Sequence, residues 1–131
     1  MIDSDSHAVV TTIPVGTRPV GIAITPDGGA AYVANTDSDN VSVIDAETNV
    51  LVGTVTVGKD PEGLASSPNG ESIYVTNFSS RSVSVINTGT NMVTATVTVG
   101  FGPVDVTFTP DGAFAYVTNN ASNSVSVIDT A

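Results

Sequence analysis

The chain has no cysteine and no tryptophan, one histidine and only three basic residues. Without cysteine it can form neither a disulfide nor a thiolate metal site, and the single histidine, His7, excludes a multi-histidine metal site within one chain. Its 13 acidic side chains give a net charge of −10, which would repel the phosphates of nucleic acids and anionic membranes. No apolar run is long enough to span a bilayer. We therefore expect no nucleic acid partner and no membrane insertion.

What the sequence does contain is a repeat. Gly16, Gly58 and Gly100 are spaced by 42 residues (58 − 16 and 100 − 58), and a proline stands three positions after each of them. Residues 17–58 and 59–100 agree without gaps at nearly half of their positions, and residues 101–131 continue the pattern. A fixed period of this size predicts stacked structural modules.

Each unit contains four short β-type runs. In the second unit they are Glu62–Ser67, Ser72–Asn77, Val83–Ile86 and Val93–Val99. The first two runs are joined by Pro-Asn-Gly at 68–70, and the same turn recurs as Pro-Asp-Gly at 26–28 and 110–112. Proline fixes φ and glycine accepts positive φ, so this pattern predicts a hairpin. Four-stranded antiparallel units packed radially are typical of an all-β fold, the β-propeller.

The second run of each unit carries a recognisable motif. It reads Tyr-Val-Thr-Asn at 74–77 and 116–119, and Tyr-Val-Ala-Asn at 32–35, while Ser-Val-Ser-Val-Ile follows at 82–86 and 124–128. In these motifs the chain resembles the YVTN-type β-propeller repeat family. The resemblance implies the propeller architecture found in archaeal and bacterial surface-layer and other extracytoplasmic proteins, and hence an extracellular or cell-surface location. It says little about chemistry, because propellers host many functions.

The repeat divides the chain into one repeat domain, residues 1–131. Residues 17–58 form the first blade, 59–100 the second, and 101–131 the first three strands of a third. Residues 7–16 align with 49–58, so residues 1–16 are predicted to supply the outer strand of the closing blade. In addition, Met1-Ile2-Asp3 at the start of the chain aligns in the repeat with Val127-Ile128-Asp129 near its end.

Three blades are too few for a closed ring, which typically has about four to eight. We therefore expect a homo-oligomer in which the N-terminal strand of one chain completes the last blade of its neighbour. Two chains would give a six-bladed homodimer. A larger ring, or a fragment that pairs in another way, is the alternative.

The loops of one propeller face vary most between units, which predicts a ligand-binding surface there. The candidate residues are Arg18, Asp37, Asp39, Lys59, Asp60, Phe78, Arg81 and Phe101. Neutral drift in exposed loops is the alternative explanation. Asp37 and Asp39 offer oxygens that suit calcium, but the segment lacks the glycine and the distal glutamate of a dedicated calcium loop. No metal or cofactor is predicted.

Two further sets of residues are candidates for the channel and for packing between blades. Glu62 and Asp105 lie on or beside the innermost strands, and we expect one of them to line a hydrated central channel rather than to act in acid–base catalysis. Tyr32, Tyr74 and Tyr116 occupy one repeat position, which predicts packing between blades.

The leading functional hypothesis is a self-assembling structural or interaction module of a surface-layer-like protein, without catalysis, either natural or an excerpted or designed fragment. The alternative is a module that binds a glycan or a peptide through the variable loops. A third hypothesis is a propeller enzyme, such as a lyase or a holder of a redox cofactor. Against it stand the single histidine, the absence of cysteine and tryptophan, and the lack of a catalytic pair at a meaningful spacing.

Overall fold

The computed structural model describes residues 1–131, which form three antiparallel sheets. The strands are β1 (Pro19–Ile24), β2 (Ala30–Asn35), β3 (Asn40–Asp45), β4 (Val50–Thr56), β5 (Pro61–Ser66), β6 (Ser72–Asn77), β7 (Ser82–Asn87), β8 (Met92–Thr98), β9 (Pro103–Phe108), β10 (Phe114–Asn119) and β11 (Ser124–Asp129). The sheet orders are β1-β2-β3-β4, β5-β6-β7-β8 and β9-β10-β11, so the third sheet has one strand fewer. We call the three sheets blades 1, 2 and 3.

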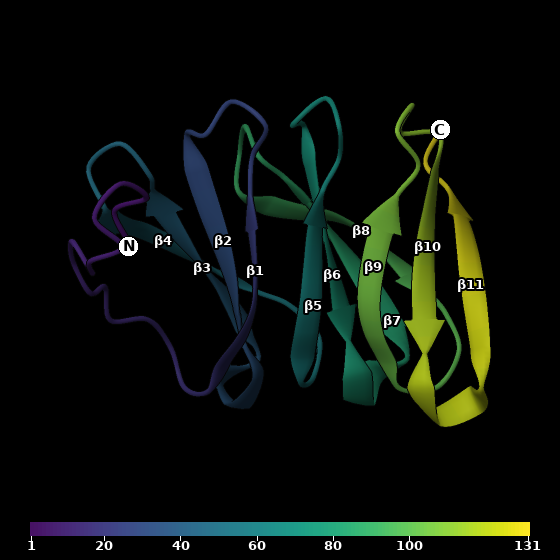
Figure 1. Cartoon of the computed structure of the whole chain (residues 1–131). Coiled ribbons are helices and arrows are strands. Elements are labelled where there is room, and N and C mark those ends of the chain that lie inside the picture. The colour runs from purple at the N-terminus through teal and green to yellow at the C-terminus, as the bar shows by residue number, and fades with distance from the viewer.

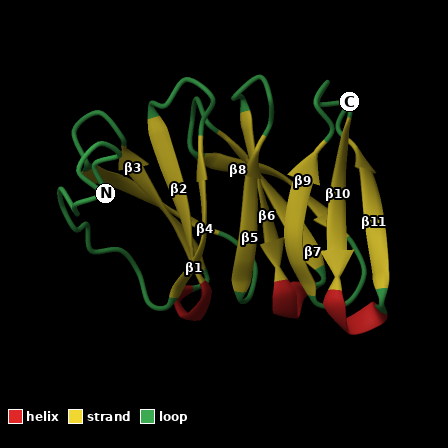
Figure 2. Ribbon diagram, viewed as in Figure 1, coloured by secondary structure: helices red, strands yellow, loops and turns green.

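The blades fan out side by side, with β1, β5 and β9 as neighbouring innermost strands (Figure 1). Three 3₁₀ turns, η1 (Thr36–Ser38), η2 (Phe78–Ser80) and η3 (Asn120–Ser122), connect the second and third strands of the blades. Figure 2 shows these turns along the lower edge and the tight hairpin turns along the upper edge. We call these edges the loop face and the turn face. No helix in the structure is long and apolar enough to cross a membrane.

The hairpin turns form as the Pro-Asp-Gly pattern predicts. Gly28 adopts φ +74°, which a side chain would strain, and no atom lies within 4 Å of the place where its Cβ would be. The carboxylate of Asp27 accepts hydrogen bonds from the N–H of Gly29 at 2.9 Å and from the hydroxyl of Thr25 at 2.7 Å. The same turn is built by Asn69 in blade 2. Backbone φ and one short polar side chain therefore fix each hairpin.

The asparagine that ends each Tyr-Val-Thr-Asn motif is buried between strands. The Nδ2 of Asn35 donates to the Oγ of Ser42 at 2.8 Å, and Asn77 and Asn119 make the same bond to the serines of their own third strands. A Cβ on Gly16 would lie 2.6 Å from the side chain of Asn35. The repeating glycine and the repeating asparagine are thus two sides of one close contact.

The hydrophobic core lies between blades rather than within them. Blades 1 and 2 enclose one cluster, which includes Tyr32, Val41 and Ile73, and blades 2 and 3 enclose another, which includes Tyr74 and Val117. This confirms the β-propeller architecture, and it buries the first two repeated tyrosines between blades. A third, smaller cluster on the outer side of blade 1 has no blade opposite it.

Within a single chain residues 1–16 form no strand, and the repeat predicts one for them only against the last blade of a neighbouring chain. Their only β-type pairing is an isolated bridge between Ile2 and Val9. The N-terminus and the C-terminus lie at opposite ends of the fan (Figure 1), so residues 8–14 cannot reach β11 of their own chain. As a result β11 is an open edge.

Candidate functional site

The loop face holds all eight predicted binding residues. Arg18 and Asp37 lie where the chain enters blade 1, and the others lie around the two internal blade boundaries. The blade linkers and the 3₁₀ turns are tied by backbone hydrogen bonds, for example from the N–H of Phe78 to the carbonyl of Asp60 at 2.9 Å. Arg18, Asp39, Asp60 and Arg81 adopt positive φ, so these side chains leave the backbone at sharp bends.

The charged residues of the loop face pair with one another. Arg18 contacts Asp37 at 3.1 Å and Lys59 contacts Asp39 at 3.2 Å. Asp39 also accepts the N–H of Asp60 at 3.0 Å, and this bond, with the ammonium of Lys59, holds the pKa of the Asp39 carboxyl below its ordinary value. Asp37 and Asp39 therefore point at different cations and do not converge on a common metal position.

The boundary between blades 2 and 3 carries an aromatic contact instead of an ion pair. The guanidinium of Arg81 lies 3.7 Å from the ring centre of Phe101, the stacking geometry of a cation–π pair. Phe101 remains 52% exposed, so an aromatic surface stays accessible beside the cation. Phe78 lies against the linker at Gly102. Positively charged and aromatic groups thus occur together here, and only here, on the loop face.

The two faces differ in charge. The loop face holds all three basic residues and three acids, whereas the turn face holds no base and six acids: Asp27, Asp45, Glu47, Glu71, Asp111 and Asp129. Hydrogen bonds from Gly29 and Thr25 lower the pKa of the Asp27 carboxyl, and bonds from Thr109 and Ala113 do the same for Asp111. The carboxylates of Asp27 and Asp111 therefore stay ionised to a lower pH than an ordinary aspartate.

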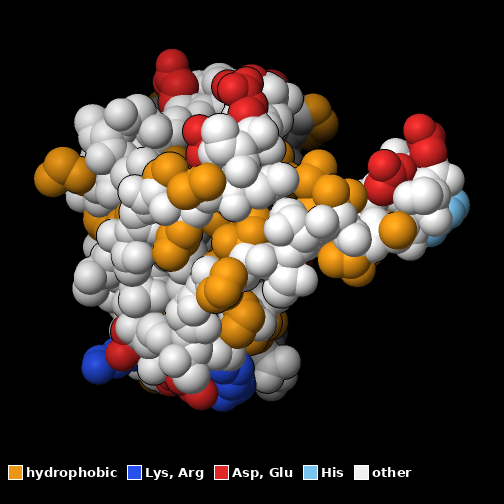
Figure 3. Space-filling view, turned by 90° about the vertical axis from the view of Figure 1, so that its left-hand side faces the viewer, with side chains coloured by type: hydrophobic (Ala, Val, Ile, Leu, Met, Phe, Trp, Pro, Cys, Tyr) orange, Lys and Arg blue, Asp and Glu red, His pale blue; other side chains and the backbone are white.

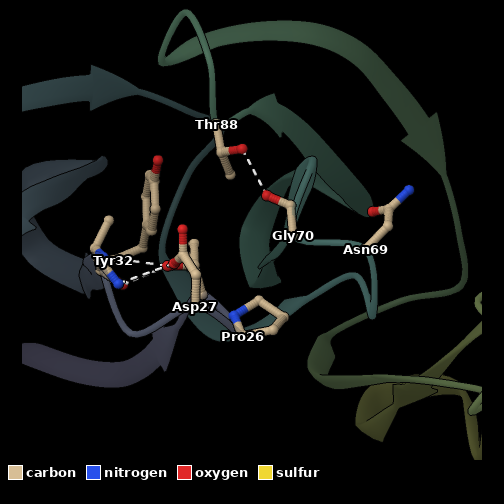
Figure 4. Close-up of a pocket in the computed structure, with 9 residues that line it drawn as sticks. Pro26, Asp27, Tyr32, Asn69, Gly70 and Thr88 are labelled. Atoms are coloured by element: carbon tan, nitrogen blue, oxygen red, sulfur yellow. Dashed lines mark hydrogen bonds between the residues drawn. The ribbon is translucent and has the colours of Figure 1, made fainter.

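A polar cavity of about 470 Å³ opens on the turn face between blades 1 and 2 (Figure 4). Its walls include Asp27, Tyr32 and Thr88, whose hydroxyl donates to the carbonyl of Gly70 at 2.6 Å. The equivalent cavity between blades 2 and 3 has only about 160 Å³. There Phe108 packs edge-on against a tyrosine, whereas a serine occupies the same repeat position at the first boundary. The cavity between blades 1 and 2 is therefore larger because Ser66 fills less space there than Phe108 does between blades 2 and 3.

The most exposed apolar surface lies on the two outer faces of the fan. On the outer side of blade 3, the "blade 3 open face", Tyr116, Val125 and Val127 are 43%, 57% and 54% exposed. Their repeat equivalents in blade 1 are Tyr32, Val41 and Val43, at 1%, 0% and 2%. Toward the loop face this surface contains a hollow of about 490 Å³, lined in part by Thr118 and Asn123.

The outer side of blade 1, the "blade 1 open face", is apolar as well (Figure 3). Ile22 is 64% exposed there, whereas its repeat equivalent Leu64 is 8% exposed at an internal boundary. An apolar cavity of about 230 Å³ is lined by Met1, Ile13, Ile22, Ile24, Ala31, Ile44, Ala46 and Asn49. The face thus offers half of a blade–blade core without its other half.

The exposure of Val125 and the role of Asn49 were not predicted from the sequence. Val125 belongs to the repeated Ser-Val-Ser-Val-Ile motif, and Asn49 begins the segment that aligns with residues 7–16. The repeat alignment places both at positions that are buried or hydrogen-bonded elsewhere in the chain. Glu62 is partly buried and Asp105 is exposed on the innermost strands, where the carboxylate of Asp105 accepts the N–H of Val106 at 2.9 Å. The repeat alignment was the signal for Asn49 and Val125, whereas Glu62 and Asp105 were predicted from the sequence to lie on or beside the innermost strands.

The fold and its open faces define the chain as a set of β-propeller blades. The family profile of the YNCE-like beta-propeller matches residues 23–131, and the chain belongs to that family. This confirms the propeller-repeat resemblance that its motifs predicted. A search of curated protein sequences found no significant match.

Solved structures support the same fold. Hydrazine synthase from Kuenenia stuttgartiensis is similar over 94% of this chain and 36% of its own, with 33% identity and a TM-score of 0.84. A protein of unknown function from Desulfotomaculum acetoxidans is similar over 98% of this chain and 46% of its own, with 22% identity and a TM-score of 0.80. A proposed 6-phosphogluconolactonase from Bacteroides fragilis is similar over 91% of this chain and 36% of its own, with 20% identity and a TM-score of 0.79. The chain thus spans between a third and a half of these proteins.

Proposed function

We propose that this chain is a self-assembling β-propeller module, in which the blade 3 open face of one copy packs on the blade 1 open face of another. The observation that carries the proposal is that each open face repeats one side of an internal boundary. Val125 is 57% exposed, but its equivalents Val41 and Val83 are completely buried. A second copy supplies the missing side through blade 1 residues such as Ile22, whose repeat equivalent Leu64 packs this way inside the chain.

A specific hydrogen bond extends this match. The hydroxyl of Tyr32 donates to the Oδ1 of Asn91 in blade 2 at 2.6 Å. Two repeats further along the ring, the equivalent pair is Tyr116 of one copy and Asn49 of a second copy. Asn49 lines the apolar cavity of the blade 1 open face, so the acceptor stands at the edge of the site that the Tyr116 ring would fill.

In the N-terminal arm, residues 7–16, the seated part at residues 13–15 supports ring closure. Ile13 and Val15 pack against the blade 1 cluster just as Val55 and Val57 pack at the boundary of blades 1 and 2. By the pairing of Ile86 with Val93, residues 8–14 would add to the open edge of β11 in a second copy as its fourth strand. Two copies would then give six complete blades, within the range of closed propellers.

One residue distinguishes the boundary between copies from the internal boundaries. A Cβ on Gly21 would lie 2.2 Å from the carbonyl oxygen of Glu62, and one on Gly63 would lie 2.5 Å from that of Val104. The third repeat has Asp105 at this position. The innermost strands must therefore stand further apart between copies than within the chain, which leaves room for the carboxylate beside the channel.

Mutation of the Tyr116–Asn49 pair tests the proposal. We expect the chain to scatter light as a species of twice its 13.2 kDa mass. Tyr116→Phe and Asn49→Ala should each weaken the dimer by about tenfold, since one hydrogen bond of about 0.5–1.5 kcal/mol is lost at each of two boundaries. The double variant should be no weaker than the more affected single variant, because both remove the same bond. Additive losses, or a wild-type chain that stays monomeric over two decades of concentration, would contradict ring closure.

A second candidate function, ligand binding at the loop face, is favoured by the Arg81–Phe101 pair. An exposed aromatic ring beside a cation suits a glycan or an anionic peptide. Screening the wild type and Phe101→Ala on glycan and peptide arrays tests this. A ligand retained equally by both variants would show that it does not bind there. Surface-layer membership, an extracellular location and the absence of catalysis stay predictions from the sequence.

A further inference from the structure

The first ten residues form a small hairpin that copies the turn between the third and fourth strands of a blade. Ile2 bridges Val9, as Ile44 pairs with Leu51 in blade 1. The N–H of His7 donates to the carbonyl of Asp3 at 2.7 Å, just as Asn49 donates to Asp45 at 2.8 Å. Residues 1–3 therefore occupy the place of the end of a third strand.

The side chain of Asp3 reproduces the turn as well. Its carboxylate accepts the N–H groups of Asp5 and Ser6 at 2.8 and 3.0 Å. Asp45 accepts two N–H groups in the same way, at 2.9 and 3.2 Å. The hairpin is thus held by the same bonds that close a complete blade, although it belongs to no blade of its own chain.

Closing the ring requires the edge of residues 8–11, which the hairpin already uses, to pair with β11 of a second copy. The register of β7 and β8 pairs Ile86 with Val93 and Asn87 with Met92. At the boundary between two copies, the repeat equivalents of these pairs are Ile128 of one copy with Val9 of the other, and Asp129 of one copy with Ala8 of the other. In the single chain Val9 already pairs with Ile2, and the N–H of Asp3 already donates to the carbonyl of Ala8 at 2.7 Å.

Met1 extends the overlap to the apolar face. It lines the cavity of the blade 1 open face together with Ile13 and Ile22, and it stands at the repeat position of Val43, which is buried at the first internal boundary. In the ring that position belongs to Val127 of a second copy. Figure 3 shows the hairpin, marked by the single histidine, projecting beside the apolar face.

We propose that Met1–Asp3 acts as an internal competitor of β11, so that the N-terminal hairpin and ring closure exclude each other. This inference rests on the proposed self-assembly and says how it is regulated. The hairpin must open before residues 8–11 can pair with Val127–Asp129 of a second copy. The rest of the arm keeps its position, because Ile13 and Val15 are already seated.

A reversible disulfide tests the competition. The hydrogen bonds from Asp3 to Ala8 and from Val10 to Met1 flank the Ile2–Val9 pair, which makes it a non-hydrogen-bonded pair. Such pairs have a Cα separation of about 4.5 Å, within the range of disulfides. The chain has no cysteine, so Ile2→Cys with Val9→Cys would form a single bond that clips the hairpin shut.

Three proteins are compared by light scattering: the clipped variant with and without reductant, a variant lacking residues 1–3, and the wild type with reductant as control. We expect the oxidised clip to weaken the dimer at least about tenfold relative to its reduced form. A hairpin that cannot open keeps residues 8–11 from forming backbone hydrogen bonds to β11 at both boundaries of the dimer. The shortened variant should dimerise more tightly than the wild type.

Equal dissociation constants for the oxidised and reduced clip would overturn the competition. They would leave self-assembly standing if Tyr116→Phe still weakened the dimer. If the shortened variant and the reduced clip were both monomeric at every concentration, both the proposed ring closure and the proposed competition by the hairpin would be wrong.

Discussion

A lysine at Val125 should abolish assembly, while a lysine at Val52 should not. The two valines are 57% and 58% exposed in the single chain, so the substitutions match in residue type, charge and initial exposure. Val125 becomes buried between copies, as its equivalents Val41 and Val83 are buried within the chain. Val52 stays exposed, because its equivalent Thr94 is exposed in blade 2, which has a neighbour on each side.

The magnitude follows from what Val125 would bury. Full burial of a valine contributes about 1.5–3 kcal/mol, and half of that surface is at stake, which gives about 1 kcal/mol per boundary. Burying an unpaired ammonium adds at least about 1 kcal/mol, even when the lysine extends toward solvent. Two boundaries per dimer then give about 4 kcal/mol, or roughly a thousandfold in the dissociation constant.

Light scattering on a sizing column distinguishes the outcomes. We expect Val125→Lys at the mass of one chain under conditions where Val52→Lys has twice that mass. Circular dichroism melts at low concentration check that both single chains fold equally well. If both variants dissociated alike, or if Val125→Lys kept the wild-type dimer, the open faces would not be the assembly surface.

Three further predictions concern the boundary, the turns and pH. Asp105→Gly should tighten the dimer by at least about tenfold in equilibrium sedimentation, because overpacking costs about 1–3 kcal/mol and occurs at two boundaries; no change would mean that the carboxylate fits without strain. Gly28→Val should lower the unfolding free energy by about 1–3 kcal/mol more than Gly53→Val in urea titrations, since a Cβ meets no atom at either site and only Gly28 has positive φ. The folded-state pKa of Asp27 lies below its ordinary value of 3.8, so the stability that this carboxylate contributes is complete above pH 3.8 and is lost as the pH falls through the folded pKa. Asp27→Asn, which copies Asn69 of blade 2, should therefore flatten the melting temperature against pH below 4, and an unchanged acid slope would refute this assignment.

Much of the fold could be predicted because each repeated residue has a local role. The second strand of blade 2 was predicted over the residues it occupies, Ser72–Asn77, since its hairpin turn and its terminal asparagine bound it on both sides. The predicted first run began one residue late, because Pro61 adopts the strand conformation and pairs with Asn77.

What the sequence could not provide is the outcome of contacts between segments. Residues 8–14 have the pattern of a strand but lack a free edge within reach in their own chain, so the pattern does not say how they are arranged there, where Ile2 and Val9 form a bridge. The pairing of Asp39 with Lys59 and the stacking of Arg81 on Phe101 depend on backbone bends that no motif encodes. The effect of Asp105 on the spacing of the innermost strands could not be predicted, because it depends on the close backbone contacts at Gly21 and Gly63.

The uneven charge of the two faces has a consequence for how the proposed ring would sit on a surface. A two-fold axis along the channel keeps all tight turns on one side, so a dimer would present twelve carboxylates there and every basic residue on the opposite side. Such a disc has a large electric dipole along its axis. It should land turn face down on a positively charged support, with the Arg81–Phe101 pairs pointing outward into solution.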